Sequence, residues 1–237
     1  MATSKLPVKL YEAIVLLALH DEKGTSVGWY IEYSVAAAIL AELMLRQKIA
    51  LSSDNKQHVG VLDSSPTGDP VMDEALAKIA EKSRPDSLQN WVMAIGYIHD
   101  LKHKVAAQLV ADGIIEADTQ KVLWLFTQKI YPEVNPEPER IIREQMRAVV
   151  LTDVTPSHPH LSLLIALAQS AYLLPEVFTK SELKAHKARI DAIAKGELLG
   201  EAASDIVNSV QAAIMVAVIL PTILSAATTA STSSSGC

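Results

Sequence analysis

Apolar residues recur at helical spacing along almost the whole of this 237-residue chain. Leu10, Ile14 and Leu17 mark a first helix over about 8–20, and the same spacing predicts a second helix over about 30–47. Only 9 glycines and 11 prolines interrupt the pattern, which favours helices over tight turns. We therefore predict a mostly α-helical fold.

The pattern continues to the C-terminal end and is interrupted by two short alternating segments. Each alternating segment contains polar turn residues, which is typical of a small β-hairpin. We predict helices over about 69–81, 87–112 (one helix or two in close succession), 137–150, 161–174, 181–195 and 199–224, and hairpins over about 48–62 and 114–126. In the second hairpin we expect the strands 114–115 and 121–126 on either side of a turn at 116–120. Since no change of composition marks a linker, we expect one compact domain over 1–225, followed by a disordered Ser/Thr/Ala tail over 226–237.

The composition excludes several classes of protein. Hydrophobic residues make up 49% of the chain and charged residues 20%, a globular balance that is inconsistent with a disordered chain. The single cysteine, Cys237, excludes a disulfide framework. A net charge of −6 argues against a protein whose whole surface binds nucleic acid.

The C-terminal segment 206–237 contains no charged residue. As a helix, 206–224 would extend over ~28 Å, close to the thickness of a bilayer core. It nevertheless contains polar residues such as Asn208 and Gln211, and no basic anchor follows it. We favour a helix buried all round in the core over a tail anchor. At the other end, Glu12 precedes the first apolar run, so we expect no secretory signal.

The segment 94–109 carries the residues that most suggest ligand binding. Drawn as one helix, it places His99, Lys102 and His103 on the flank of an apolar stripe. Such a flank can present cations to a phosphate, although a solvated helix face is the commoner explanation of the same pattern. His99 and His103 also have the spacing of a metal pair, but the glutamate of a metalloprotease helix does not follow His99. We expect no metal site.

Aromatic residues in two other segments suggest contact with a membrane or a partner. Trp29 lies in a loop between helices, where it can join the core or anchor the chain at a membrane interface. The second hairpin contains an apolar run that cannot bury both of its faces against one core. A helix covers the second face, or that face is available for self-association or membrane contact. The run consists of Val122, Leu123, Trp124, Leu125 and Phe126.

Signals of catalysis are weak. Ser162, His160 and Asp153 lie close in sequence but lack the strand–turn–helix context of a nucleophile elbow. The loop 64–70 lacks the lysine and the spacing of a phosphate-binding loop. Asp69, Asp73 and Glu74 could bind a cation but are better explained as the acidic first turn of the helix over about 69–81, which Asp69 or Thr67 caps. We therefore predict a protein that is not an enzyme and that uses no cofactor.

Several blocks of the sequence, in order between about 8 and 220, match a pattern known from one family. They are LYEA at 10–13, LLALHDEKG at 16–24, LAELMLRQKI at 40–49, PTGDPVMDEAL at 66–76, NW at 90–91 and LVADGII at 109–115. With these blocks the chain resembles the Golgi phosphoprotein 3 family, and the block 66–76 is the most specific. The matching blocks begin almost at Met1, which suggests a short, bacterial or divergent member.

The resemblance implies both a fold and a role. The expected fold is a mostly helical domain around a hydrophobic C-terminal helix. The expected role is that of a non-enzymatic adaptor that binds phosphatidylinositol 4-phosphate at an anionic phospholipid membrane. Such a protein would be cytoplasmic and peripheral on membranes, on the cytosolic face of the Golgi in a eukaryote. Its expected partners are client membrane proteins and further copies of itself, with no nucleic acid.

The resemblance also implies headgroup-binding residues. Trp29 corresponds to the pocket tryptophan of the family, and His99 and Lys102 to two of its arginines. Ala36 corresponds to a third arginine and supplies no cation. Ala36 and His99 therefore favour an alternative, a soluble protein-interaction module of the same fold that has lost the lipid site. A winged-helix nucleic-acid binder is a further alternative, which the acidic net charge disfavours.

Overall fold

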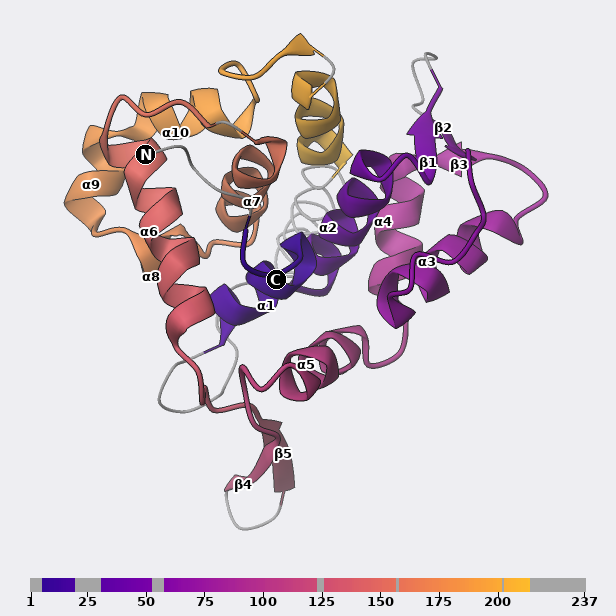
Figure 1. Cartoon of the computed structure of the whole chain (residues 1–237), viewed down its shortest axis with the longest axis horizontal. Helices are drawn as coiled ribbons and strands as arrows, with labels where there is room; N and C mark the ends of the chain where they lie inside the picture. Colours follow the sequence, from indigo (N-terminus) through magenta and orange to yellow (C-terminus); the bar gives the residue numbers. More distant parts are fainter. Residues whose placement is uncertain are drawn as a thin grey trace, which may run out of the picture.

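The computed structural model describes residues 6–19, 31–52, 58–122, 126–156, 158–201 and 203–213, without the side chains of 121, 122 and 126–128. Within these ranges the chain forms one helical domain with two small antiparallel sheets (Figure 1). The predicted fold class is therefore confirmed.

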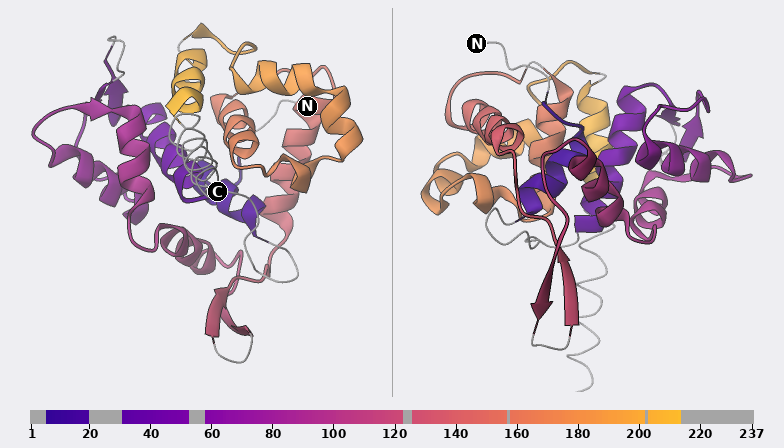
Figure 2. Two further views of the ribbon diagram at one scale, coloured as in Figure 1. Left: turned by 180° about the vertical axis from the view of Figure 1, so that it is seen from behind. Right: turned by 60° about the horizontal axis from the view of Figure 1, so that its bottom comes forward.

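Two helices form the centre of the domain. Every residue of α1 (Leu10–Ala18) is buried, and α2 (Ile31–Leu45) is buried along most of its length. Both helices are apolar around most of their circumference, which is typical of a helix surrounded by others. They pack against each other and against helices on both sides (Figures 1 and 2). The predicted ranges 8–20 and 30–47 agree with these helices to within a few residues.

The remaining helices form two groups around this centre. One group contains α3 (Pro70–Ala80), α4 (Leu88–Gly96) and α5 (Leu101–Ala111). The other contains α6 (Glu137–Leu151), α7 (Pro159–Ser170), α8 (Leu174–Val177), α9 (Lys180–Ala185) and α10 (Lys187–Ala194). Figure 1 shows α3 and α4 on one side of α1 and α2, and α6 to α10 on the other. The predicted helix 181–195 is thus two helices, which meet at His186.

The predicted first hairpin is confirmed, and a third strand extends it. The strands β1 (Ile49–Leu51), β2 (His58–Val61) and β3 (Asp86–Ser87) form an antiparallel sheet in that order. The sequence did not indicate β3, because a strand of two residues has no detectable alternation. Since β2 is central, one edge of β1 faces away from the sheet.

The predicted second hairpin exists, but its strands lie elsewhere in the sequence. They are β4 (Asp118–Val122) and β5 (Phe126–Ile130), and Val122 is paired with Phe126. We expected the run 121–126 to form one strand, but it contains the end of β4 and the start of β5. The predicted partner strand at Ile114 and Ile115 is buried but does not pair with 121–126, because Ile115 forms an isolated antiparallel bridge with Glu133, beyond β5. Figure 2 shows the hairpin projecting from the helical body.

The C-terminal helix differs from its prediction in the part that the structure describes. Residues 203–213 are helical, and Val207, Val210 and Ala213 are buried. Asn208 and Ala212 are exposed, so 206–213, the described part of the segment that we predicted to be buried all round, is amphipathic. The rest of the predicted helix and the predicted tail 226–237 lie outside the described residues. None of the helices in the described ranges combines the length and the apolar character that a bilayer span requires.

Candidate functional site

The predicted cationic flank lies where α4 gives way to α5. Gly96 is the last residue of α4, and Asp100 adopts a left-handed backbone with φ of 58° before α5 begins at Leu101. The segment 94–109 is therefore not a single helix. Because His99 lies in the connection, the helical projection that placed it beside Lys102 and His103 was wrong. For the stretch 87–112 we predicted either one helix or two in close succession, and the structure shows two.

The two described headgroup candidates are exposed to different degrees. The His99 side chain is 93% exposed, and its Nδ1 atom lies 3.5 Å from Oδ2 of Asp100. Lys102 lies in the first turn of α5 and is partly buried. The structure thus brings both residues to the same end of α5, where an anion in solution can reach His99. Trp29 lies outside the described residues, so its predicted place beside them stays a prediction.

His103 links this end of α5 to the β4–β5 hairpin. Its Nδ1 atom lies 2.8 Å from the hydroxyl of Tyr131, the residue that follows β5. Partial burial lowers the pKa of His103, and the nearby charges of Lys102 and Lys129 lower it further. Asp100 and Glu32 act in the opposite direction but do not cancel this effect. His103 therefore favours the neutral form, which suits its hydrogen bond to the tyrosine.

A cavity of about 340 Å³ lies between α5 and the base of this hairpin. Small apolar side chains from α5 and the connection form much of its wall, and Lys129 adds a cation. The lining residues are His103, Ala107, Val110, Ala117, Asp118, Thr119, Lys129 and Tyr131. Val122 and Phe126 belong to the same hairpin, but Leu123, Trp124 and Leu125 lie outside the described residues. The expected role of this run in self-association or membrane contact stays a prediction.

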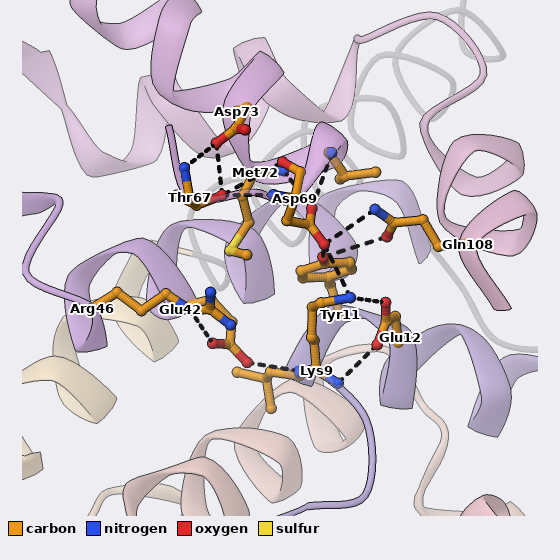
Figure 3. Close-up of polar contacts among 12 residues, drawn as sticks. Lys9, Tyr11, Glu12, Glu42, Arg46, Thr67, Asp69, Met72, Asp73 and Gln108 are labelled. Atoms are coloured by element: carbon orange, nitrogen blue, oxygen red, sulfur yellow. Dashed lines mark hydrogen bonds and ion pairs between the residues drawn. The ribbon is translucent and has the colours of Figure 1, made fainter. Parts of the chain in front are cut away.

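A second polar cluster lies inside the molecule, between α1 and the start of α3 (Figure 3). Asp69 caps α3 by accepting hydrogen bonds from the backbone of Val71 and Met72, at 3.0 and 2.9 Å. It also accepts one from the Tyr11 hydroxyl at 2.6 Å and one from Gln108 at 3.1 Å. This one carboxylate therefore connects α1, α3 and α5.

Two buried glutamates extend the cluster. Oε1 of Glu42 accepts a hydrogen bond from the Leu10 backbone at 2.9 Å and lies 3.8 Å from Nε2 of His160. Glu12 forms an ion pair with Lys9, which also reaches Asp69 at 3.0 Å. Burial would raise the pKa of Glu42, but His160, the Leu10 amide and Arg46 outweigh it and lower the pKa. Each buried charge thus has a partner, which is the condition for a stable buried ion.

Local sequence patterns did not predict this cluster as a unit. Asp69 and Thr67 were the two predicted caps of α3, and the structure shows that Asp69 is the cap, but its contacts with Tyr11 and Gln108 were not predicted. One signal was present: Glu12 is the charged residue of α1, and Glu42 lies in the apolar second half of α2. In the part of the chain that the structure describes, no group of three or more potential ligands is arranged to hold a metal ion.

Comparison with known proteins identifies the family. The family model described as Golgi phosphoprotein 3 (GPP34) matches residues 10–210. This chain belongs to the Golgi phosphoprotein 3 family. The resemblance predicted from the sequence blocks is therefore confirmed.

Two curated relatives of this chain have the same name. "Vacuolar protein sorting-associated protein 74" of Schizosaccharomyces pombe is 29% identical over 194 residues, covering 69% of this chain and 57% of the relative. The protein of the same name from Eremothecium gossypii is 25% identical over 170 residues, covering 63% of this chain and 51% of the relative. The chain thus spans somewhat more than half the length of each relative.

The block 66–76, the most specific part of the sequence resemblance, forms the start of α3. It contains Thr67, Asp69 and Asp73, which form the capped start of α3 and its link to α1. Ala36, the position matched to a family arginine, lies in α2 and is fully buried. An arginine in its place would not reach the surface without a rearrangement of α2.

Proposed function

We propose that this chain is a peripheral membrane protein that binds an anionic phospholipid headgroup, phosphatidylinositol 4-phosphate, as a non-enzymatic adaptor in Golgi trafficking. The observation that carries the proposal is the exposed imidazole of His99 in the connection before α5, at the same end of this helix as Lys102, in a chain of the Golgi phosphoprotein 3 family. The names of the two relatives, which refer to vacuolar protein sorting, support a role in sorting between membranes.

The expected affinity of one copy is low. A basic residue near an anionic surface contributes about 1 kcal/mol, and a partly inserted tryptophan adds about 2 kcal/mol. Such a sum corresponds to dissociation constants of about a millimolar or weaker. We therefore propose that binding depends on several copies acting together, with the hairpin run 122–126 as the self-associating or membrane-contacting segment. Client membrane proteins would be recruited to this assembly at the cytosolic face of the membrane.

Flotation with liposomes tests the proposal directly. Vesicles that contain phosphatidylinositol 4-phosphate are compared with vesicles of the same total charge made with phosphatidylserine. We expect more protein to float with the phosphoinositide. Equal flotation with both would reject recognition of the headgroup, and no flotation with either would reject membrane binding.

Substitutions test His99 and Lys102 separately in the same flotation assay. His99→Ala and Lys102→Ala should each weaken flotation with the phosphoinositide, because each removes a group that can contact the phosphate. His99→Arg should strengthen it, because a guanidinium offers two parallel donors to a phosphate. Ionic strength is held constant, because salt weakens every exposed ionic contact.

A soluble protein-interaction module of the same fold is the second candidate. Two observations favour it: Ala36 supplies no cation and is buried, and His99 lacks the bidentate guanidinium that the resemblance implies at its position. If this candidate is correct, the protein should float with neither vesicle and should bind a protein partner.

A further inference from the structure

Within the described residues, one edge of β1 has no neighbouring strand. The residues on either side of β1 form backbone hydrogen bonds to β2 and its neighbours. The Lys48 carbonyl accepts one from the Leu62 amide at 2.9 Å, and the Ser52 amide donates one to the His58 carbonyl at 2.8 Å. In an antiparallel pair, residues that bond to the partner strand alternate with residues whose backbone groups point outward, so those of Ile49 and Leu51 point away from β2. In the described ranges, no backbone hydrogen bond reaches these outward groups.

A cavity of about 580 Å³ runs along this edge. One wall is β1, the second is the helical segment 203–213, and the end of α2 closes the base between them. The yellow segment in Figures 1 and 2 is this helix beside α2. The lining residues are Met44, Gln47, Ile49, Ala50, Leu51, Ser52, Leu62, Asp205, Ile206, Asn208 and Ser209.

The lining combines apolar contacts with one negative charge. Most of the larger side chains are apolar, among them Met44, Leu51 and Ile206. Asp205 is the charged member of the lining set, it is exposed, and no cation in the described part of the chain pairs with it. An occupant that offers apolar side chains and a positive charge therefore matches this wall.

We propose that the groove binds an extended peptide segment of a partner protein, which pairs with β1 as an added strand and places a lysine or arginine against Asp205. Strand addition to an exposed sheet edge takes its affinity from main-chain hydrogen bonds and its specificity from alternate side-chain pockets. Adjacent strands lie about 4.8 Å apart, and a cavity of several hundred Å³ accommodates a short segment at that spacing. This site uses the end of α2, β1 and 203–213, so it is separate from the cationic end of α5.

The probe is a fluorescein-labelled octapeptide of alternating valine and threonine that carries one central arginine. Its binding to the full chain is measured by fluorescence anisotropy, and the protection of the Ile49 and Leu51 amides is measured by hydrogen exchange. We expect saturable binding and slower exchange at both amides. A peptide methylated on alternate backbone nitrogens cannot pair as a strand and should bind at least about fivefold more weakly.

Substitutions in the groove measure the contribution of the backbone hydrogen bonds separately from that of the Asp205 charge. Leu51→Pro removes one outward N–H but leaves the ladder to β2 intact, so it should weaken the arginine peptide about fivefold. Asp205→Lys should reverse the preference, with a central-glutamate peptide binding more tightly than the arginine peptide. Glu116→Lys is the matched control, because it makes the same charge change at an exposed residue outside the groove.

Several outcomes would overturn the proposal. Binding that is unchanged in both Leu51→Pro and Asp205→Lys would show that the peptide binds elsewhere. If the peptide does not bind and Leu51→Pro instead lowers the sedimentation coefficient, the edge of β1 pairs with a second copy of the chain. Since these measurements use no lipid, their failure is distinguishable from failure of the proposed headgroup binding.

Discussion

At the scale of single residues, Asp69 shows how a buried charge can stabilise a mainly apolar core. Burial alone would raise the pKa of this carboxyl, but hydrogen bonds from Tyr11, the Met72 amide, Lys9 and Gln108 outweigh burial and lower the pKa. The ionised form is therefore the one that the fold stabilises. Asp69 combines helix capping with a link between helices, two functions that substitution can separate.

Substitution of Asp69 should lower stability in proportion to the contacts that it removes. Asp69→Ala removes the cap and leaves Tyr11 and Lys9 without their buried acceptor, so the free energy of unfolding should fall by about 3 kcal/mol. Asp69→Asn keeps a good cap and should cost less. Since the folded pKa lies below the unfolded value of about 3.9, the contribution of Asp69 is complete above about pH 5 and is lost as pH falls further.

Urea unfolding of the parent chain and Asp69→Asn at pH 7, 5 and 4 measures this effect. The parent chain should lose more stability between pH 5 and 4 than the variant does. Glu42, whose pKa is also lowered, contributes equally to both proteins and cancels in the difference. Parallel pH profiles would contradict the role assigned to the Asp69 charge.

His103 should affect stability in a higher range of pH. Its folded pKa is lowered below the unfolded value of about 6.5, so the unfolded chain binds more protons just below that pH. Stability should therefore fall as pH drops from about 7 through 6.5 and below. His103→Gln should flatten this part of the profile, and NMR titration of the imidazole should give a midpoint below 6.5. A midpoint above 6.5 would show that Asp100 and Glu32 outweigh burial.

At the scale of elements, the contact between α2 and α4 depends on the absence of a side chain. A Cβ atom added at Gly96 would lie 2.7 Å from Cδ1 of Tyr33, far closer than van der Waals contact. Tyr33 in turn packs edge-on against Tyr97, with 6.0 Å between ring centroids. The end of α4 can therefore approach α2 closely only because residue 96 is a glycine, and this approach sets where the connection to α5 begins.

Gly96→Ala should therefore destabilise the chain, although alanine is the better helix former. Overpacking costs about 1–3 kcal/mol, and the helix propensity returns up to about 1 kcal/mol, so we expect a net loss of about 1 kcal/mol. Adding Tyr33→Ala removes the clash, so the double variant should lose less than the sum of the single variants. A double-mutant cycle by urea unfolding measures this coupling, and strict additivity would contradict the clash.

At the scale of the whole molecule, the central position of α1 and α2 should make folding cooperative. Both groups of outer helices pack on these two helices, so neither group retains its core without them. Leu17→Ala would open a cavity at a fully buried position of α1 and should lower the free energy of unfolding by about 2–5 kcal/mol. Near-ultraviolet and far-ultraviolet circular dichroism should report the same midpoint. Separate midpoints would show that the two groups of helices unfold independently.

The family and several helices could be predicted from the amino-acid sequence. Helical periodicity and helix punctuation are local properties, so the bounds of α1, α2, α3 and α6 were predicted to within a few residues. The positions of charged residues and of turns depend instead on contacts between distant elements. The bond between Tyr11 and Asp69 joins residues 58 positions apart, and the turn at Asp100 places His99 off the helix on which its spacing had placed it. Local spacing cannot specify such contacts, because burial and partner choice depend on elements that are distant in sequence.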